Sequence, residues 1–416
     1  MPELLPFRNF HYKIGKSNPD KLRMLIAPPY DVISEEEVIK MKKHPDNICH
    51  VILPETYDAA GQKLDEMIKN ETLVTGPDRC ICIYGIDYTR PDTGVKISRY
   101  GFVGLLKLVE IFPATERVIP HEATFRKFTK DRLNIIQKTD GNFSPIFTIY
   151  DGNGTADNLF NKYITKKPFI ETLDREGFTH KIWEVSNEDD IKRFQKIVKN
   201  HEIIIADGHH RFITSLRHSK HGGCKYIMAL FIDFNDPGLI IFPNHRLIRK
   251  LTVNSIEEIK DKVKEKFEII ENINDINDFK NKMEQFKGQH VFGIYFLKKY
   301  LILRLKDNVR PEDYMKDIKK TTEWKNLNLP ILHNILLKEC LDVKIEDIDF
   351  IKGLEKGIEF VDEREDIEAL FVVNPATLEE IQKITRLGEI MPQKSTYFYP
   401  KPLSGLIIHR HSNKIE

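Results

Sequence analysis

The sequence is poor in cysteine, with only five in 416 residues, at positions 49, 80, 82, 224 and 340. Scattered cysteines in odd number provide neither a disulfide framework nor the paired ligands of a zinc site. Cys80 and Cys82 alternate along a strand-like run, so we expect them to share one face of that strand. This cysteine content is typical of a protein from a reducing compartment.

Two kinds of segment that direct a chain to a membrane are also missing. The start, Met1-Pro2-Glu3, lacks the basic residues and the apolar stretch of a signal peptide. No apolar run reaches the roughly 20 residues that a membrane-spanning helix needs. We therefore expect a cytoplasmic protein with no membrane partner.

The chain has almost no net charge, since 64 Lys and Arg stand against 63 Asp and Glu. A formal charge of +1 and a pI near 7.7 give no field that would attract a polyanion. No basic arm is present, so we expect no nucleic-acid partner. The 41% hydrophobic and 31% charged residues are ordinary for globular proteins, and the length allows two or three domains.

The common nucleotide-binding motifs are absent from the sequence. Gly152-Asn153-Gly154 lacks the third glycine and the preceding strand of a dinucleotide fingerprint. No Gly-rich P-loop occurs, and no internal repeat or heptad pattern is visible. The sequence therefore contains none of the usual motifs of an adenine-nucleotide site.

What the sequence does contain is a dense polar turn behind an apolar run. Ile203 to Ala206 is typical of a buried strand, Asp207-Gly208 breaks it, and helix-compatible residues follow from His209. A helix start offers free backbone N–H groups and a partial positive charge to an anion. Gly208 lets a ligand approach the backbone, and Arg211 provides a planar fork for phosphate or carboxylate.

The alternative interpretation of this turn is purely structural. Asp207 would then be a plain N-cap of a charged helix. Two further residues favour a site, because His209 and His210 can donate hydrogen bonds or exchange protons near neutral pH. Charged and imidazole groups at the end of an element are the usual material of functional sites.

The remaining pattern alternates between strands and helices, which predicts an α/β or α+β fold. Pro28-Pro29 ends one expected strand, and Ser34 with Glu37 predicts a capping box at a helix start. Expected strands lie at 24–27, 48–53, 80–89, 95–109, 144–150, 179–185, 203–206, 225–234, 239–242, 291–297, 300–305 and 369–373. Expected helices span about 57–75, 131–137, 156–175, 255–267 and 276–287, and others start at Ser34, Ser186, His209 and Thr377.

Four other polar clusters are candidates for the same site, although each has an ordinary structural explanation. Tyr30-Asp31 is also a simple proline-led turn, and Glu122 alone is usually a solvated loop carboxylate. Residues 243–246 combine a cation with an imidazole, and their structural explanation is the polar end of a strand. Lys394-Ser395-Thr396 has phosphate-holding groups but no Gly-rich loop. The clusters read Tyr30-Asp31, Pro120-His121-Glu122-Ala123-Thr124, Pro243-Asn244-His245-Arg246 and Lys394-Ser395-Thr396.

Taken in order, these motifs resemble those of one large uncharacterised-domain family of bacteria and some protists. The resemblance extends over nearly the whole chain and includes Met391 to Pro400. The Asp-Gly-His-His-Arg stretch, residues 207–211, also looks like the signature of the ParB/sulfiredoxin-like superfamily. That group includes free serine kinases, in which a Pro-His-Glu stretch precedes this turn. The resemblance therefore implies a ParB/sulfiredoxin-like catalytic core with added mixed-sheet and helical segments.

The resemblance implies an enzyme that phosphorylates the free amino acid serine. Longer members that resemble this chain use pyrophosphate as donor, which implies conversion of L-serine and pyrophosphate to O-phosphoserine and phosphate, with Mg²⁺, in serine and cysteine metabolism. Alternatives remain open: an ADP- or ATP-dependent serine kinase, a phosphoserine phosphatase, a ParB-like nucleic-acid-binding protein, or a metabolite sensor without turnover. The sequence gives no indication of oligomeric state.

The resemblance and the chemistry of phosphoryl transfer together suggest a role for each candidate residue. Glu122, Asp207 and His210 are the expected catalytic groups, and Asp207 is also the expected metal ligand. Expected donor-binding residues are Gly208, His209, Arg211, Arg246, Lys394, Ser395 and Thr396. Expected substrate-binding residues are Tyr30, Asp31, His121, Thr124, Asn244 and His245.

Four segments are expected along the chain. Residues 1–150 form an N-terminal α/β part, and 151–250 form the core with the Asp207 turn. Residues 251–345 form a charged subdomain or lid, and 346–416 return to the core. We expect Glu122, Asp207, His210, Arg211 and Lys394 to converge around one cleft, because each lies at the end of an element.

Overall fold

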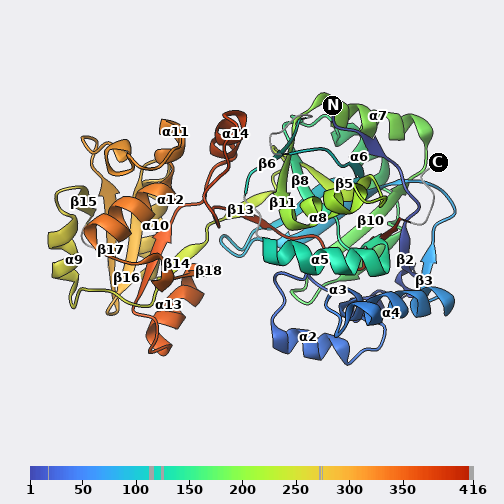
Figure 1. Ribbon diagram of the computed structural model, residues 1–416, viewed down its shortest axis with the longest axis horizontal. Coiled ribbons are helices and arrows are strands. Elements are labelled where there is room, and N and C mark those ends of the chain that lie inside the picture. The colour runs from blue at the N-terminus through green and yellow to red at the C-terminus, as the bar shows by residue number, and fades with distance from the viewer. Residues whose placement is uncertain (17, 112–116, 123–125, 271–272, 274, 412–416) are drawn as a thin grey trace. The chain divides into compact units, whose positions relative to one another are not determined.

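The computed structural model describes the whole chain except residues 17, 112–116, 123–125, 271–272, 274 and 412–416. The chain forms two compact units (Figure 1). The first consists of Met1–Ile240 and Pro400–Glu416, and the second of Ile241–Tyr399. The division of the chain expected near residues 150, 250 and 345 stays a prediction.

The expected mixed α/β fold is confirmed. A mixed sheet of nine described strands organises the first unit, in the order β6-β11-β8-β12-β5-β4-β10-β9, with β1 paired to β5. Its strands are β1 (Leu4–Leu5), β4 (Ile81–Thr89), β5 (Lys96–Lys107), β6 (Val118–Pro120), β8 (Ile146–Tyr150), β9 (Ile170–Leu173), β10 (Thr179–Val185), β11 (Ile203–Asp207) and β12 (Tyr226–Asp233). Short ribbons pair β2 (Phe10–Tyr12) with β3 (Leu73–Thr75), and β7 (Gly141–Asn142) with β21 (His409–Arg410).

Helices complete the first unit and bury the apolar side chains of the sheet. Phe102 on β5 lies 4.7 Å from Phe194 of a helix and 5.0 Å from Phe231 of β12, between ring centroids. Such aromatic contacts stabilise a core beyond their buried area. The helices are α1 (Pro19–Arg23), α2 (Glu35–Lys42), α3 (Cys49–Ile52), α4 (Tyr57–Lys69), α5 (Arg126–Thr139), α6 (Asp157–Ile164), α7 (Glu188–Asn200) and α8 (His209–Ser219).

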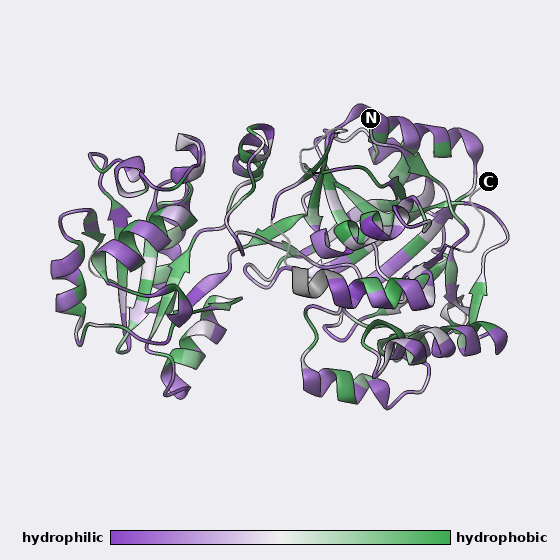
Figure 2. Ribbon diagram, viewed as in Figure 1, coloured by the Kyte–Doolittle hydropathy of each residue, from purple (hydrophilic) through white to green (hydrophobic). Residues whose placement is uncertain are grey.

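Hydropathy follows this arrangement. The strands of the large sheet are mainly hydrophobic, whereas α5 and α7 also show hydrophilic residues (Figure 2). Helices α5 and α8 pack side by side (Figure 1).

Within the described chain, no helix is both long and apolar enough to cross a membrane. All five cysteines are free.

Several local predictions are confirmed. The strands expected at 80–89 and 95–109 correspond to β4 and β5, which pair in antiparallel register from Cys82↔Val103 to Thr89↔Lys96. The Ser34–Glu37 capping box is present at the start of α2. The apolar run 203–206 is strand β11, and α8 begins at His209.

Two expected strands near the N-terminus are wrong, and one side chain explains both. Residues 24–27 form only a bridge from Ala27 to Ser404, and 48–53 contain helix α3. The Asn47 amide donates to the carbonyls of Met24 (2.8 Å) and Ile26 (3.3 Å), which a neighbouring strand would otherwise occupy. Its oxygen also accepts from the N–H of Cys49, the first residue of the helix, at 2.8 Å.

The helix expected within 156–175 is shorter than predicted. Helix α6 ends at Ile164, and residues 170–173 form β9. Pro168 lies between them, and proline removes a helical hydrogen bond and clashes with the preceding turn. The apolar residues after Pro168 therefore pair with β10 instead.

The second unit contains a six-stranded sheet in the order β15-β17-β16-β19-β14-β18. Strand β13 (Ile240–Phe242) ends where Pro243 was expected to end it, but His245 and Arg246 already begin the next strand, β14. The strands are β13 (Ile240–Phe242), β14 (His245–Ile248), β15 (Phe267–Ile270), β16 (Val291–Phe296), β17 (Lys299–Leu305), β18 (Ile348–Ile351), β19 (Ala369–Val373) and β20 (Tyr397–Tyr399), with β13 paired to β20. The helices include α9 (Ile256–Val263), α10 (Ile276–Gln285), α11 (Thr322–Lys325), α12 (Asn328–Ile331), the π-helix η3 (Leu332–Cys340), α13 (Leu354–Glu363) and α14 (Leu378–Arg386).

Candidate active site

The turn between β11 and α8 is built around a left-handed glycine. Gly208 is the N-cap of α8 and has φ of 93°. A Cβ at this position would lie 2.8 Å from Ile146 Cγ2 and 2.9 Å from Arg211 Nη2, so a side chain would be strained and crowded. No side chain caps α8, and Asp207 is the last residue of β11. The interpretation of Asp207 as a plain N-cap is therefore wrong.

Asp207 is held between two cations. Its Oδ1 pairs with Lys401 Nζ, and its Oδ2 accepts from Arg211 Nη2 at 3.0 Å. Burial would by itself raise the pKa of Asp207, but Lys401 and Arg211 together lower it to about 2. The carboxylate therefore stays ionised at neutral pH, and it does not have the pKa of an efficient general base.

Lys401 is the residue of this cluster that the sequence did not predict. Its side chain is only 8% exposed, and besides Asp207 it pairs with Asp31 Oδ2 at 3.4 Å. The segment after Pro400 returns to the first unit and brings this lysine to the turn. The one available signal was its position between Pro400 and Pro402, which restricts the backbone on both sides.

Two buried histidines join the Pro-His-Glu segment to the turn. Strand β6 pairs in parallel with β11, in the register Ile205↔Pro120, so both chains leave the sheet at the same end. The N–H of His121 donates to His209 Nε2 at 3.3 Å, and His121 Nδ1 lies 2.6 Å from the Ile205 carbonyl. Because a carbonyl only accepts and a backbone N–H only donates, His121 carries its proton on Nδ1 and His209 Nε2 is unprotonated.

Both rings are neutral for the same reason. Burial lowers the pKa of His121, and burial together with the proximity of His121 lowers the pKa of His209 well below its usual value. Glu122 follows His121 directly, so its backbone lies beside the Asp207 turn at the same sheet end. Thr124 lies outside the described residues.

Arg211 is anchored inside the first unit. Its Nη1 donates to the hydroxyl of Ser144 (2.9 Å) and to the carbonyls of Ser144 (3.2 Å) and Pro145 (2.9 Å). With the bond to Asp207, these contacts use most of the planar fork that was expected to bind a donor. Arg211 therefore holds the turn against β8 in this structure.

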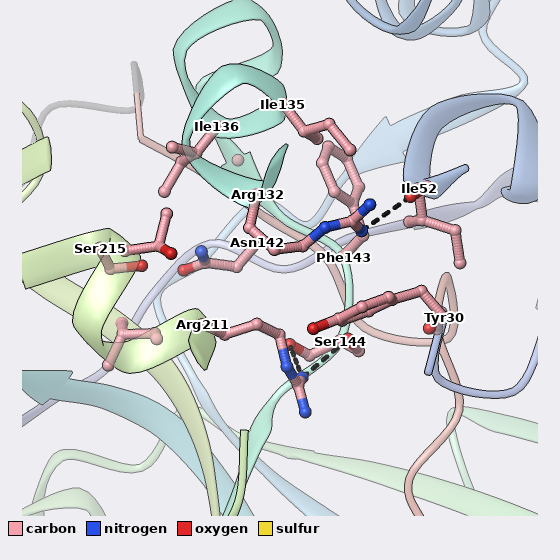
Figure 3. Close-up of a pocket in the computed structure, with 14 residues that line it drawn as sticks. Tyr30, Ile52, Arg132, Ile135, Ile136, Asn142, Phe143, Ser144, Arg211 and Ser215 are labelled. Carbon is pink, nitrogen blue, oxygen red and sulfur yellow. Dashed lines mark hydrogen bonds between the residues drawn. The ribbon is translucent and has the colours of Figure 1, made fainter. Parts of the chain in front are cut away.

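A small cavity of about 70 Å³ lies beside Arg211. In Figure 3 the hydroxyl of Tyr30 points toward Arg211 and Ser144, and Arg132 from α5 lies on the opposite side of the Tyr30 ring. The Arg132 guanidinium is 4.0 Å from the centroid of that ring. Burial raises the pKa of Tyr30, so its hydroxyl remains a proton donor at neutral pH. Arg132, which the sequence did not single out, therefore belongs to the surroundings of this site.

The predicted site residues between Asn244 and Thr396 belong to the second unit. Asn244 Nδ2 donates to the carbonyls of Lys394 (3.2 Å) and Thr396 (3.4 Å), and the Ser395 hydroxyl donates to the Pro392 carbonyl. These bonds fix the 394–396 turn against the start of β14. The convergence of Lys394 with the Asp207 turn stays a prediction.

Arg246 is fully buried within its own unit. It is 0% exposed, its Nε donates to His333 Nε2 at 3.0 Å, and its guanidinium lies 5.0 Å from the centre of the Phe350 ring. Burial lowers the pKa of Arg246 to about 9, and burial together with Arg246 lowers the pKa of His333 to about 3. The π-helix η3 positions His333, which lies in a segment where the sequence showed no chemical cluster.

Comparisons with known proteins give a family match and distant structural similarity. Residues 4–330 match the family model described as "Protein of unknown function (DUF1015)". No curated protein matches the chain. A mutant free serine kinase in complex with ADP is 15% identical, over 69% of this chain and 88% of its own, with a TM-score of 0.34. A free serine kinase in complex with AMP is 15% identical, with the same coverage and a TM-score of 0.33.

A third solved structure, SbnI with a C-terminal truncation from Staphylococcus aureus, is 10% identical. The match covers 71% of this chain and 82% of that protein, with a TM-score of 0.34. Structural similarity at this level carries no argument about the chemistry of the present chain.

The neutral His121–His209 pair predicts a dependence of stability on pH. The unfolded chain binds a proton at each histidine below about pH 6.5, whereas the folded chain resists it, so the free energy of unfolding falls as pH falls through that range. His209→Gln retains an acceptor for the His121 N–H and removes one titrating group. For each unit by which the pH falls, the unfolding free energy of this variant should therefore decrease by up to ~1.4 kcal/mol less than that of the unmodified protein.

Urea denaturation at about pH 7.5 and pH 5.5 measures this difference. His221→Gln, at an exposed residue just beyond the other end of α8, is the matched control. An identical pH slope in His209→Gln and the unmodified protein would show that His209 is not held neutral.

Removing Lys401 should weaken the first unit. Lys401→Met keeps the aliphatic stem but leaves Asp207 with Arg211 alone, so we expect a loss of roughly 1–3 kcal/mol in unfolding free energy. The pKa of Asp207 should also rise, which moves acid destabilisation to higher pH.

Lys13→Met is the control for Lys401→Met, because it breaks an exposed ion pair with Glu71. Exposed pairs contribute little, so this variant should lose less than about 1 kcal/mol. Equal losses in the two variants, measured by urea denaturation at neutral pH, would contradict a special role for the Lys401 contact.

Proposed function

This chain belongs to the DUF1015 family of proteins of unknown function, and we propose that it transfers a phosphoryl group from pyrophosphate to the hydroxyl of free L-serine. One observation carries the proposal: the parallel pairing of β6 with β11 joins the Pro-His-Glu segment to the Asp-Gly-His-His-Arg turn. The carboxylate of Asp207, the imidazoles of His121 and His209, and the uncapped N–H groups at the start of α8 thus lie at one end of the sheet. Phosphoryl transfer needs these groups for positioning and charge neutralisation.

In the proposed reaction the serine Oγ attacks one phosphorus of pyrophosphate. The bond from that phosphorus to the bridging oxygen breaks, and orthophosphate leaves with the electron pair. Glu122 accepts the hydroxyl proton of serine, which then passes to solvent or to the leaving phosphate. His210 and the first N–H groups of α8 bind the phosphoryl oxygens.

The contacts of Asp207 assign it a positioning role in this proposal. Both of its oxygens are held by cations, and its low pKa makes it a poor proton acceptor. We infer that Asp207 fixes the ammonium of Lys401 and the guanidinium of Arg211 beside the donor site. This arrangement differs from the metal-binding role expected from the sequence.

The same contacts bear on the expected Mg²⁺. Asp207 does not fit a resident metal ligand, since a cation pairs with each of its oxygens, and Asp31 is paired with Lys401. Mg²⁺ commonly binds through substrate phosphates and few protein carboxylates. We therefore propose that pyrophosphate enters as its magnesium complex.

A donor panel tests the proposal directly. The full-length protein is incubated with saturating serine, Mg²⁺ and equal concentrations of pyrophosphate, ADP or ATP, and products are followed by phosphorus NMR. We expect O-phosphoserine and orthophosphate with pyrophosphate, and formation of pyrophosphate when the products are mixed.

The other arms of the panel separate the alternatives. Turnover with ADP or ATP but none with pyrophosphate would replace the donor and leave the serine kinase assignment intact. Release of phosphate from O-phosphoserine in water, without dependence on pyrophosphate, would support a phosphatase. Absence of turnover in every arm would reject the proposal.

Glu122→Gln tests the proton acceptor. It keeps size and hydrogen-bonding capacity but removes the carboxylate, so turnover should fall by roughly 10²–10⁴. The folded state should persist, because Glu122 is a partly exposed loop residue. Initial rates at saturating substrates are the measurement, and circular dichroism verifies folding.

Glu110→Gln is the matched control, because this exposed glutamate pairs with Lys220 on the surface. It should retain the full rate. Near-normal turnover in Glu122→Gln would exclude Glu122 as the proton acceptor, whatever the donor.

A further inference from the structure

A second group of chemically active side chains lies in the first unit, outside the Asp207 cluster. Asp140, His218 and His411 each offer one ligand atom, and these atoms all lie within 4.8 Å of one another. Asp140 Oδ1 is 3.0 Å from His411 Nδ1 and 3.9 Å from His218 Nε2. The three residues come from separate elements: the end of α5, the helix α8, and the chain just after β21.

His411 is held in the cluster by its side chain and by its backbone. The side chain is only 4% exposed, and Nδ1, the ring nitrogen that would bind the ion, faces Asp140 Oδ1. The His411 N–H also donates to the Asp140 carbonyl at 2.8 Å, so the backbone holds the ring in place.

The backbone beside His218 leaves space for its ring. A Cβ at Gly223 would lie 2.1 Å from His218 Cδ2 and 2.4 Å from His218 Nε2. Any side chain at Gly223 would therefore displace this imidazole. The absence of one allows His218 to point toward Asp140.

We propose that Asp140, His218 and His411 bind a divalent transition-metal ion of the zinc class. Two imidazoles and one carboxylate are a ligand set for zinc and for related first-row ions. Bonds of about 2.0–2.1 Å to a tetrahedral ion place ligand atoms about 3.3 Å apart. The 3.0 and 3.9 Å separations here bracket that value, so modest side-chain rotation completes the site.

The ion has a structural role in this proposal. It ties together three elements that also carry residues of the candidate active site: α5 with Arg132, α8 with Arg211, and the C-terminal segment with Lys401. Water occupies the remaining coordination position. This inference does not depend on the serine kinase proposal.

Metal binding is tested on the full-length protein without a histidine tag, stripped of metal with a chelator. Titration with ZnCl₂ should show one bound equivalent by calorimetry, and excess ZnCl₂ should raise Tm by roughly 2–4 °C. CoCl₂ should give visible absorption bands of a nitrogen- and oxygen-ligated ion. No binding of either metal to the unmodified protein would overturn the proposal, whatever the variants do.

Substitutions then locate the ion. His218→Gln and Asp140→Asn should each weaken ZnCl₂ binding by at least tenfold, and Gly223→Ala should weaken it without changing a ligand. His221→Gln, at the exposed histidine beside His218, should bind normally. Undiminished binding in His218→Gln, or an equal loss in His221→Gln, would place the metal elsewhere and reject this site.

Discussion

The ion pair between Lys401 and Asp207 is the contact on which the arrangement of the candidate active site depends. It joins the C-terminal segment to the end of β11, and further bonds follow along that segment. Arg99 Nη1 donates to the Pro400 carbonyl at 2.5 Å, and the Leu403 N–H donates to the Tyr84 hydroxyl at 3.1 Å. A lysine that is almost fully buried requires such a partner, because an isolated buried charge is costly. The tail of the chain is therefore part of the first unit.

The cost of burying an isolated charge also explains why His121 and His209 are neutral. Burial favours the neutral form of His121 and His209, the two rings beside the ends of β6 and β11. Neutral imidazoles can link backbone groups of two strands at once, as His121 does with Ile205 and His209. The turn therefore contains both neutral, hydrogen-bonded imidazoles and the ionised pair of Lys401 and Asp207.

Side chains other than the reacting groups are also held in fixed positions. Arg211, Arg132 and Lys401 are committed mainly to protein partners, and the elements that carry them meet again at Asp140, His218 and His411. A reaction that depends on charge neutralisation needs such fixed cations, because mobile ones must be ordered during each turnover. In the second unit, Arg246 shows the opposite outcome. A cation that appeared suitable for a donor is enclosed between His333 and Phe350.

The sequence by itself determined the features that local chemistry controls. The strands β4 and β5, the capping box at Ser34, and the strand–glycine–helix turn at Gly208 all follow from neighbouring residues. Only the tertiary structure decided that the apolar run after Asn47 is a helix, because the Asn47 amide bonds carbonyls more than 20 residues away. It alone also decided that Lys401, 194 residues from Asp207, completes the site. Local patterns encode backbone preference, whereas contacts between distant side chains depend on which segments the sheet brings together.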